Sequence, residues 1–151
     1  METFNLFDGE LDETTSEPGF ESNAATIGPR LGARLLGMTV YELGDGQRIC
    51  PYHFHWGTDE FLIVLEGEPI VRTPDGEETL RPGDVMCFPV GPAGGHSVRG
   101  PAKVAMISNE GIQLDVTEYP DSDKIGMWSE QGTFLIRRGV PAKYFDGERQ
   151  T

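Results

Sequence analysis

The sequence predicts an all-β domain, a barrel or sandwich built from short antiparallel strands. Short runs of β-forming residues alternate with turn signals at intervals of roughly six to twelve residues, a spacing typical of such folds. The chain of 151 residues contains 20 glycines and 11 prolines, which favours tight turns over long helices. No stretch sustains the period of about 3.6 residues that marks an amphipathic helix.

The expected strands follow one another with clear turns between them. Gly44-Asp45-Gly46, Pro74-Asp75-Gly76 and Pro82-Gly83 are the clearest turns. In chain order, the strands are expected at residues 35–43, 49–56, 60–66, 70–73, 78–80, 85–88, 96–99, 103–108 and 113–119. Their number and length suit one domain with a single core.

The chain divides into three parts. Residues 1–29 carry seven acids and no Lys or Arg, and we expect an N-terminal arm that is either a partly ordered tail or a segment packing on a neighbouring subunit. Residues 30–119 hold the barrel strands. Residues 120–151 form a C-terminal segment whose apolar clusters at 127–128, 134–136 and 144–145 predict packing on the barrel.

Charge and composition exclude several classes of partner. The formal charge of -13 disfavours binding to nucleic acid or to an anionic membrane surface. The polar, acidic beginning does not resemble a signal peptide, so we expect a cytoplasmic protein. The two cysteines, Cys50 and Cys87, do not make a disulfide framework. Cys87 is expected to be a small buried hydrophobe or, less often, a pocket thiol, and Cys50 to face away from His53.

All three histidines lie in two glycine-bounded stretches, together with a nearby carboxylate. His53 and His55 are two apart on an expected strand, so their side chains share one face, and the aromatic residues between and beside them face the other way. The turn at 57–59 lets Glu60 begin the next strand and fold back beside them. His96 follows the second stretch. A lone His-x-His is a weak signal, but this distribution favours a metal site.

The ligand types narrow the choice of metal. Neutral imidazoles and one carboxylate suit Fe(II), Mn, Ni, Cu or Zn. Four protein ligands leave two positions open on a six-coordinate ion, and open positions distinguish a reactive metal site from a closed structural one. Leu62 and Val64 share the inward face with Glu60 by strand parity, which gives the site an apolar floor.

These two stretches resemble the motifs of the cupin superfamily. The first reads His53-x-His55, four residues, Glu60, six residues, Gly67; the second reads Gly83, five residues, Pro89-x-Gly91, then His96 after four residues. The chain departs from the pattern in its turns, with Gln47 and Gly100 at positions usually held by glycine and asparagine and a longer gap before His96. The segments around 50–55, 89–96 and 119–124 are also similar to small single-domain bacterial cupins.

The resemblance implies a double-stranded β-helix, or jelly-roll barrel, that holds one divalent transition metal ion (Fe, Mn, Zn or Ni). Its ligands are expected to be His53, His55, Glu60 and His96, and a homodimer is expected. Three functions stay open: a metal-dependent enzyme on a small polar substrate, by oxygenase-type or sugar-phosphate isomerase-like chemistry; a non-catalytic cupin that binds a small acid or sugar; and a metal-free interaction scaffold. Catalytic residues beyond the ligands cannot be named from the sequence, although the lack of an obvious base favours oxygenase-type chemistry.

Overall fold

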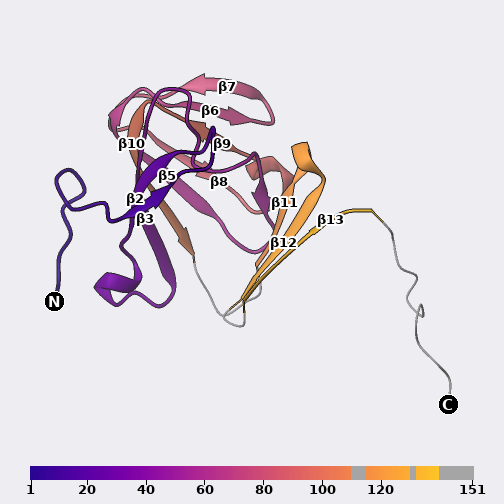
Figure 1. Cartoon of the computed structure of the whole chain (residues 1–151), viewed down its shortest axis with the longest axis horizontal. Coiled ribbons are helices and arrows are strands. Elements are labelled where there is room, and N and C mark those ends of the chain that lie inside the picture. The colour runs from indigo at the N-terminus through magenta and orange to yellow at the C-terminus, as the bar shows by residue number, and fades with distance from the viewer. Residues whose placement is uncertain (110–114, 130–131, 140–151) are drawn as a thin grey trace, which may run out of the picture.

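A computed structural model of the chain describes residues 1–109, 115–129 and 132–139. They form an all-β fold of three antiparallel sheets, as the sequence predicts (Figure 1). In the described residues the helical segments are three short 3-10 turns, η1 (Pro29–Leu31), η2 (Pro92–Gly94) and η3 (Pro120–Ser122). No helix in these ranges is long and apolar enough to cross a membrane.

The largest sheet has six strands, in the order β1-β2-β3-β10-β5-β8. Its strands are β1 (Glu13–Thr15), β2 (Ser22–Thr26), β3 (Leu36–Leu43), β10 (Ala102–Asn109), β5 (Glu60–Gly67) and β8 (Val85–Phe88). A three-stranded sheet, β7-β6-β9, contains β6 (Ile70–Thr73), β7 (Gly76–Thr79) and β9 (Ser97–Arg99). A four-stranded sheet, β13-β12-β11-β4, contains β4 (Phe54–His55), β11 (Asp115–Tyr119), β12 (Lys124–Ser129) and β13 (Gly132–Arg137).

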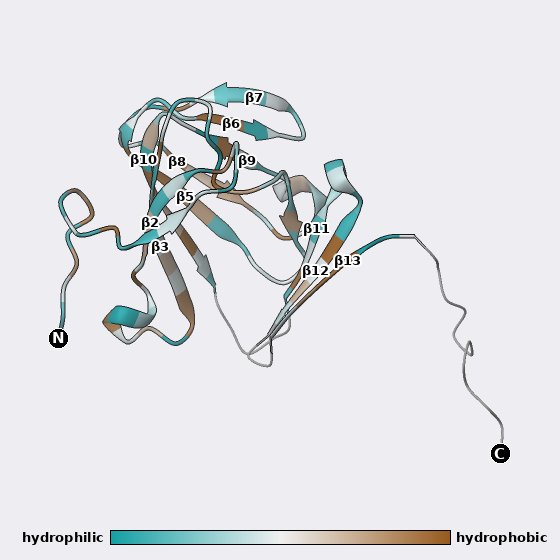
Figure 2. Ribbon diagram, in the orientation of Figure 1, coloured by the Kyte–Doolittle hydropathy of each residue, from teal (hydrophilic) through white to brown (hydrophobic). Residues whose placement is uncertain are grey.

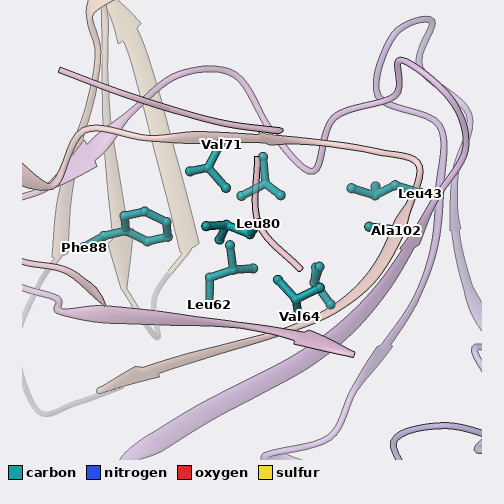
Figure 3. Packing of buried hydrophobic residues seen from close by; sticks show 9 residues of the cluster. Leu43, Leu62, Val64, Val71, Leu80, Phe88 and Ala102 are labelled. Atoms are coloured by element: carbon teal, nitrogen blue, oxygen red, sulfur yellow. The ribbon is translucent and has the colours of Figure 1, made fainter. Parts of the chain in front are cut away.

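The main core fills the space between the sheets. Leu62 and Val64 of β5 alternate with more exposed neighbours and are 0% and 1% exposed, which confirms the inward parity expected for this strand. They pack with residues from β3, β6, β8, β9 and β10, and Figure 3 shows their side chains converging. Burying one such side chain stabilises the fold by about 1.5–3 kcal/mol. The complete cluster comprises Leu43, Leu62, Val64, Val71, Leu80, Phe88, Val98, Ala102 and Val104.

The motif glycine Gly67 ends β5 where β10 passes close by. Its φ is +80°, and a Cβ there would lie 2.6 Å from the carbonyl oxygen of Pro101 and 2.8 Å from Cα of Ala102. Both the backbone conformation and the close approach therefore require glycine. The tight contact joins the ends of two central strands of the large sheet.

The N-terminal segment contributes strands to the large sheet. β2 pairs with β3 along its whole length, and Ala25 is fully buried beside Val40 and Ala105. Phe4, Leu6 and Leu11 pack against this second cluster, whereas Phe7 stays 59% exposed. Residues 22–26 were expected to lie in an arm because they include few large apolar side chains. Their small side chains fit in β2 because Phe4, Leu6 and Leu11 already cover this part of the sheet.

The expected strand at 49–56 is much shorter in the structure. Within this segment only Phe54 and His55 form a strand. Two isolated bridges precede it, one between Arg48 and Arg99 and one between His53 and His96. Pro51 explains the interruption, because proline has no N–H to donate to a ladder. The prediction of one continuous strand was wrong, but the segment still lies beside β11.

The hairpin β12–β13 extends the four-stranded sheet away from the barrel (Figure 1). All residues of β13 are exposed, including Phe134, Leu135 and Ile136 at 54%, 50% and 43%. By contrast, the equally exposed β7 consists largely of hydrophilic residues (Figure 2). The apolar pair at 144–145 lies outside the described residues. The division into arm, barrel and C-terminal segment stays a prediction.

Candidate metal centre

The structure brings His53, Glu60 and His96 together, and it places His55 beside Glu60. His53 and His96 form a reciprocal pair of backbone hydrogen bonds. The distance from His53 N to His96 O is 3.1 Å, and that from His96 N to His53 O is 2.8 Å. His55 lies on β4, and Glu60 begins β5 directly after the turn. Donor atoms of His53, Glu60 and His96 all lie within 4.8 Å of one another. Glu60 Oε2 is 3.2 Å from Nε2 of His96 and 3.5 Å from Nε2 of His55.

Each histidine uses its Nδ1 to contact an oxygen outside this group. Nδ1 lies 2.9 Å from the carbonyl oxygen of Pro51 in His53 and 2.9 Å from that of Gly94 in His96. In His55 it lies 2.5 Å from Oδ2 of Asp115. A carbonyl or carboxylate oxygen only accepts hydrogen bonds, so Nδ1 carries the proton in each ring. The Nε2 lone pairs are consequently left for the centre of the group.

Two atoms of this group are buried and have no hydrogen-bond partner among the residues that the structure describes. They are Nε2 of His55 and Oε2 of Glu60. An unsatisfied buried polar atom costs about 1–3 kcal/mol, and more for a charged group. Two donor atoms bound to one ion at about 2.1 Å and at right angles lie about 3 Å apart, close to the observed separations. The residues therefore fit a transition metal ion.

The electrostatics of the group favour a neutral His53 beside an ionised Glu60. Burial, assisted by the neighbouring His96 and His55, lowers the pKa of His53 to about 4. Burial alone would raise the pKa of Glu60, but the neighbouring imidazoles of His96, His55 and His53 hold that pKa below its usual value. His53 is thus neutral, and Glu60 ionised, at neutral pH.

The loop that delivers His96 depends on its glycines. A Cβ on Gly94 would lie 1.8 Å from the carbonyl oxygen of Pro89, and one on Gly95 would lie 2.4 Å from Oη of Tyr52. At Gly94 no other residue fits without moving the backbone, whereas at Gly95 the Tyr52 side chain would have to shift. The His96 ring stacks on Phe88 with ring centroids 3.7 Å apart and is 1% exposed. The longer gap before His96 is therefore folded into η2 and the glycine pair.

Strand β11 carries a set of contacts that the sequence analysis missed. Asp115, Thr117 and Tyr119 alternate along it and face the histidines. The Asp115 carboxylate accepts hydrogen bonds from the Gly57 N–H at 3.2 Å and from Thr117 Oγ1 at 3.3 Å, besides that from His55. The Tyr119 ring stacks on His53 at 5.8 Å. Because Glu118 lies on the other face of the strand, no polar–apolar alternation marks these residues in the sequence.

The two cysteines differ from expectation. Cys50 does not face away from the site, because its Sγ lies 3.4 Å from Nδ1 of His53. The non-strand path around Pro51 removes the parity on which that expectation depended. Burial raises the pKa of the Cys50 thiol, which keeps it protonated. Cys87 is exposed, on the outer side of β8, and does not face the pocket.

The aromatic row opposite the ligands is also divided. Phe54 is buried at 6% exposure, whereas Trp56 is 50% exposed and donates a hydrogen bond from Nε1 to Glu118 at 2.7 Å. Tyr52 packs under the Arg72 guanidinium at 4.1 Å. The three rings therefore have three different environments and do not form one uniform face.

Comparison with known proteins identifies the fold family. Residues 39–108 match the family described as Cupin domain. Residues 39–108 therefore form a cupin domain. Both motifs that carry the resemblance, from His53 to Gly67 and from Gly83 to His96, lie inside the matched range.

Solved structures superpose on 72–95% of this chain. A sugar phosphate isomerase of the cupin superfamily from Silicibacter pomeroyi superposes with a TM-score of 0.78 at 22% identity, covering 95% of this chain and 98% of its own. A provisionally assigned sugar phosphate isomerase from Acidithiobacillus ferrooxidans gives 0.72 at 22% identity over 83% and 85%. The polyketide cyclase RemF from Streptomyces resistomycificus gives 0.58 at 24% identity over 72% and 78%. These likenesses confirm the cupin fold. No curated protein matches the chain significantly.

Proposed function

We propose that this cupin binds one divalent transition metal ion, Fe, Mn, Zn or Ni, through His53, His55, Glu60 and His96. The observation that carries the proposal is the common arrangement of the three histidines, each with Nδ1–H bound to an oxygen outside the group. In His55 and His96, Nε2 also faces Glu60. Metal-ligating histidines in proteins show this arrangement almost without exception. An unpaired buried carboxylate oxygen at the centre supports the same assignment.

We further propose that the protein is a metal-dependent enzyme acting on a small polar substrate by oxygenase-type chemistry. The ion would supply open coordination positions and redox activity. The hydrogen bonds described above hold the imidazole protons at Nδ1. Phe88 excludes water by stacking on His96, and Leu62 and Val64 form the apolar base of the site. The apolar walls favour binding of dioxygen and of a small organic molecule over bulk water.

The titratable groups around the centre favour this chemistry over isomerisation. Isomerisation of a sugar phosphate needs a base that moves a proton between neighbouring carbons. Burial raises the pKa of Tyr119 and of Tyr41 to about 12 and raises that of Cys50, while Asp115 is engaged by His55. In the part of the chain described, these groups near the ligands are poor bases at neutral pH.

Sugar-phosphate isomerase-like activity is the second candidate, because two structures that superpose well carry that assignment in their names. Both are only 22% identical to this chain, so the likeness supports the fold and leaves the reaction to experiment. A third candidate, a non-catalytic cupin that binds a small acid or sugar, differs only in lacking turnover.

The test begins with metal analysis of protein purified without a chelator. We expect about one equivalent of a transition metal, lost in Glu60→Gln and kept in Glu66→Gln, an exposed carboxylate on the same strand. A metal content that is unchanged in Glu60→Gln would refute the site.

Activity then separates the candidate functions. Protein reconstituted with Fe(II), Mn(II), Ni(II) or Zn(II) is assayed for oxygen uptake over a panel of small hydroxy acids, diketones and phenols. Oxygen uptake that requires a redox metal supports the oxygenase. Anaerobic interconversion of aldose and ketose phosphates supports the isomerase instead, and tight binding without either activity supports the binding protein. Size-exclusion chromatography checks the predicted homodimer.

A further inference from the structure

A cavity lies on the outer face of the three-stranded sheet, separate from the predicted metal centre. Its volume is about 440 Å³. Val71 and Val98 turn inward to the barrel core, so Ile70 and Arg72 of β6 and Arg99 of β9 face outward and line this cavity. None of the four predicted metal ligands lines it.

Basic residues are concentrated around this cavity. Arg48, Arg72, Arg99 and Lys124 line it, which is four of the 12 Lys and Arg residues in a chain of net charge -13. They come from four distant parts of the sequence, so the folded structure alone gathers them. A strongly acidic protein that collects a third of its cations around one cavity creates a local positive field for an anion.

Carboxylates on the wall neutralise only part of this charge. Arg72 forms a bidentate pair with Asp121, at 2.5 and 3.0 Å, and Arg99 contacts Glu77 at 3.3 Å. Arg48 and Lys124 have no carboxylate partner among the described residues. Four cations and two acids leave a net charge of about +2 on the cavity wall, counting ionised groups at neutral pH.

The position of Arg48 is itself informative. It stands directly opposite Arg99 in an isolated antiparallel bridge. Like charges directly opposite one another destabilise a strand pair. An anion held between two guanidinium groups removes this repulsion and gains charge-assisted hydrogen bonds in its place.

We propose that this cavity binds a small organic oxyanion, a phosphate ester or a carboxylate that carries a ring or other compact apolar group. Arg48, Arg99 and Lys124 supply the charge for the oxyanion. Phe20, Ile70 and the Tyr52 ring supply an apolar wall for the organic part. The volume lies within the range of roughly 300–1,000 Å³ found for small-molecule sites. The proposal does not depend on the assignment of the metal centre.

Isothermal titration with phenyl phosphate, benzoate and inorganic phosphate tests the proposal. We expect phenyl phosphate or benzoate to bind more tightly than inorganic phosphate, because only they reach the apolar wall. The stronger of the two identifies the oxyanion. Each titration is run before and after removal of metal with EDTA. Binding to the cavity persists after EDTA, whereas binding lost with the metal would place the anion on the metal and overturn the proposal.

Arg48→Gln and Lys124→Gln are the informative variants, because neither change leaves a carboxylate without its cation. Each should weaken binding by about tenfold or more, the usual effect of losing one charge-assisted hydrogen bond. Arg34→Gln removes an exposed arginine outside the cavity and should change the affinity less than twofold. Circular dichroism confirms that each variant is folded. Equal weakening in all three variants, or no binding of any probe to wild-type protein, would refute the site.

Discussion

Replacing Asp115 by Asn should weaken metal binding without removing any ligand. Oδ2 of Asp115 lies 2.5 Å from Nδ1 of His55, and the carboxylate is itself held by Thr117 and the Gly57 N–H. Asparagine has the same shape but no charge, so the imidazole loses basicity and its fixed orientation. Removing a partner of this kind costs about 10–100-fold in metal affinity, or about 1.4–2.7 kcal/mol.

The assay is a titration of metal-free protein with Co(II) or Zn(II) against a competing chelator. Glu118→Gln is the matched control, since it makes the same carboxylate-to-amide change on the other face of β11, where Glu118 accepts the hydrogen bond from Trp56. In metal-free protein the pKa of His55 should fall in Asp115→Asn, because this carboxylate helps to raise it against the effect of burial. NMR titration measures that shift. Metal affinity within twofold of wild type in Asp115→Asn would refute the reasoning.

Three further predictions concern the fold. Leu62→Ala should lower the free energy of unfolding by about 2–5 kcal/mol in urea denaturation, because the side chain is fully buried, and Phe61→Ala, at 46% exposure, should cost less. Gly67→Ala should destabilise the protein more than Gly83→Ala. Both glycines have positive φ, but only at Gly67 would a Cβ also clash with neighbouring backbone, so equal losses of unfolding free energy would contradict that account. Of the two cysteines, Cys87 alone should react rapidly with a thiol reagent in native protein; labelling of both at the same rate would show that the site opens readily.

Local patterns in the sequence were sufficient to predict the fold and the grouping of the four candidate ligands. Alternation placed Leu62 and Val64 inward, and the turn before Glu60 brought it beside His55. These features depend on strand periodicity and turn chemistry within a few residues, which a single sequence displays directly. The resemblance to the cupin motifs implied that His96 joins this group, and the structure adds a backbone bridge between His96 and His53.

The parts that sequence reasoning missed depend on contacts between distant segments. Asp115 lies 60 residues from His55, and nothing near it in the chain marks it as a hydrogen-bond partner. The expectation for Cys50 failed because it applied strand parity across Pro51, where the ladder is interrupted. Strand β2 was missed because its side chains are small. It is held in the sheet by its pairing with β3.

The hydrogen bonds behind the histidines differ in how they can be altered by mutation. His53 and His96 are oriented by main-chain carbonyls, those of Pro51 and Gly94, and no side-chain replacement at either acceptor deletes the carbonyl. Of the three histidines, His55 is the one whose Nδ1–H is bound by a side-chain carboxylate. Sequence drift can therefore adjust one imidazole while the other two stay fixed by the backbone. Variation at position 115 is the simplest route by which relatives of this protein could acquire a different metal preference while keeping all four ligands.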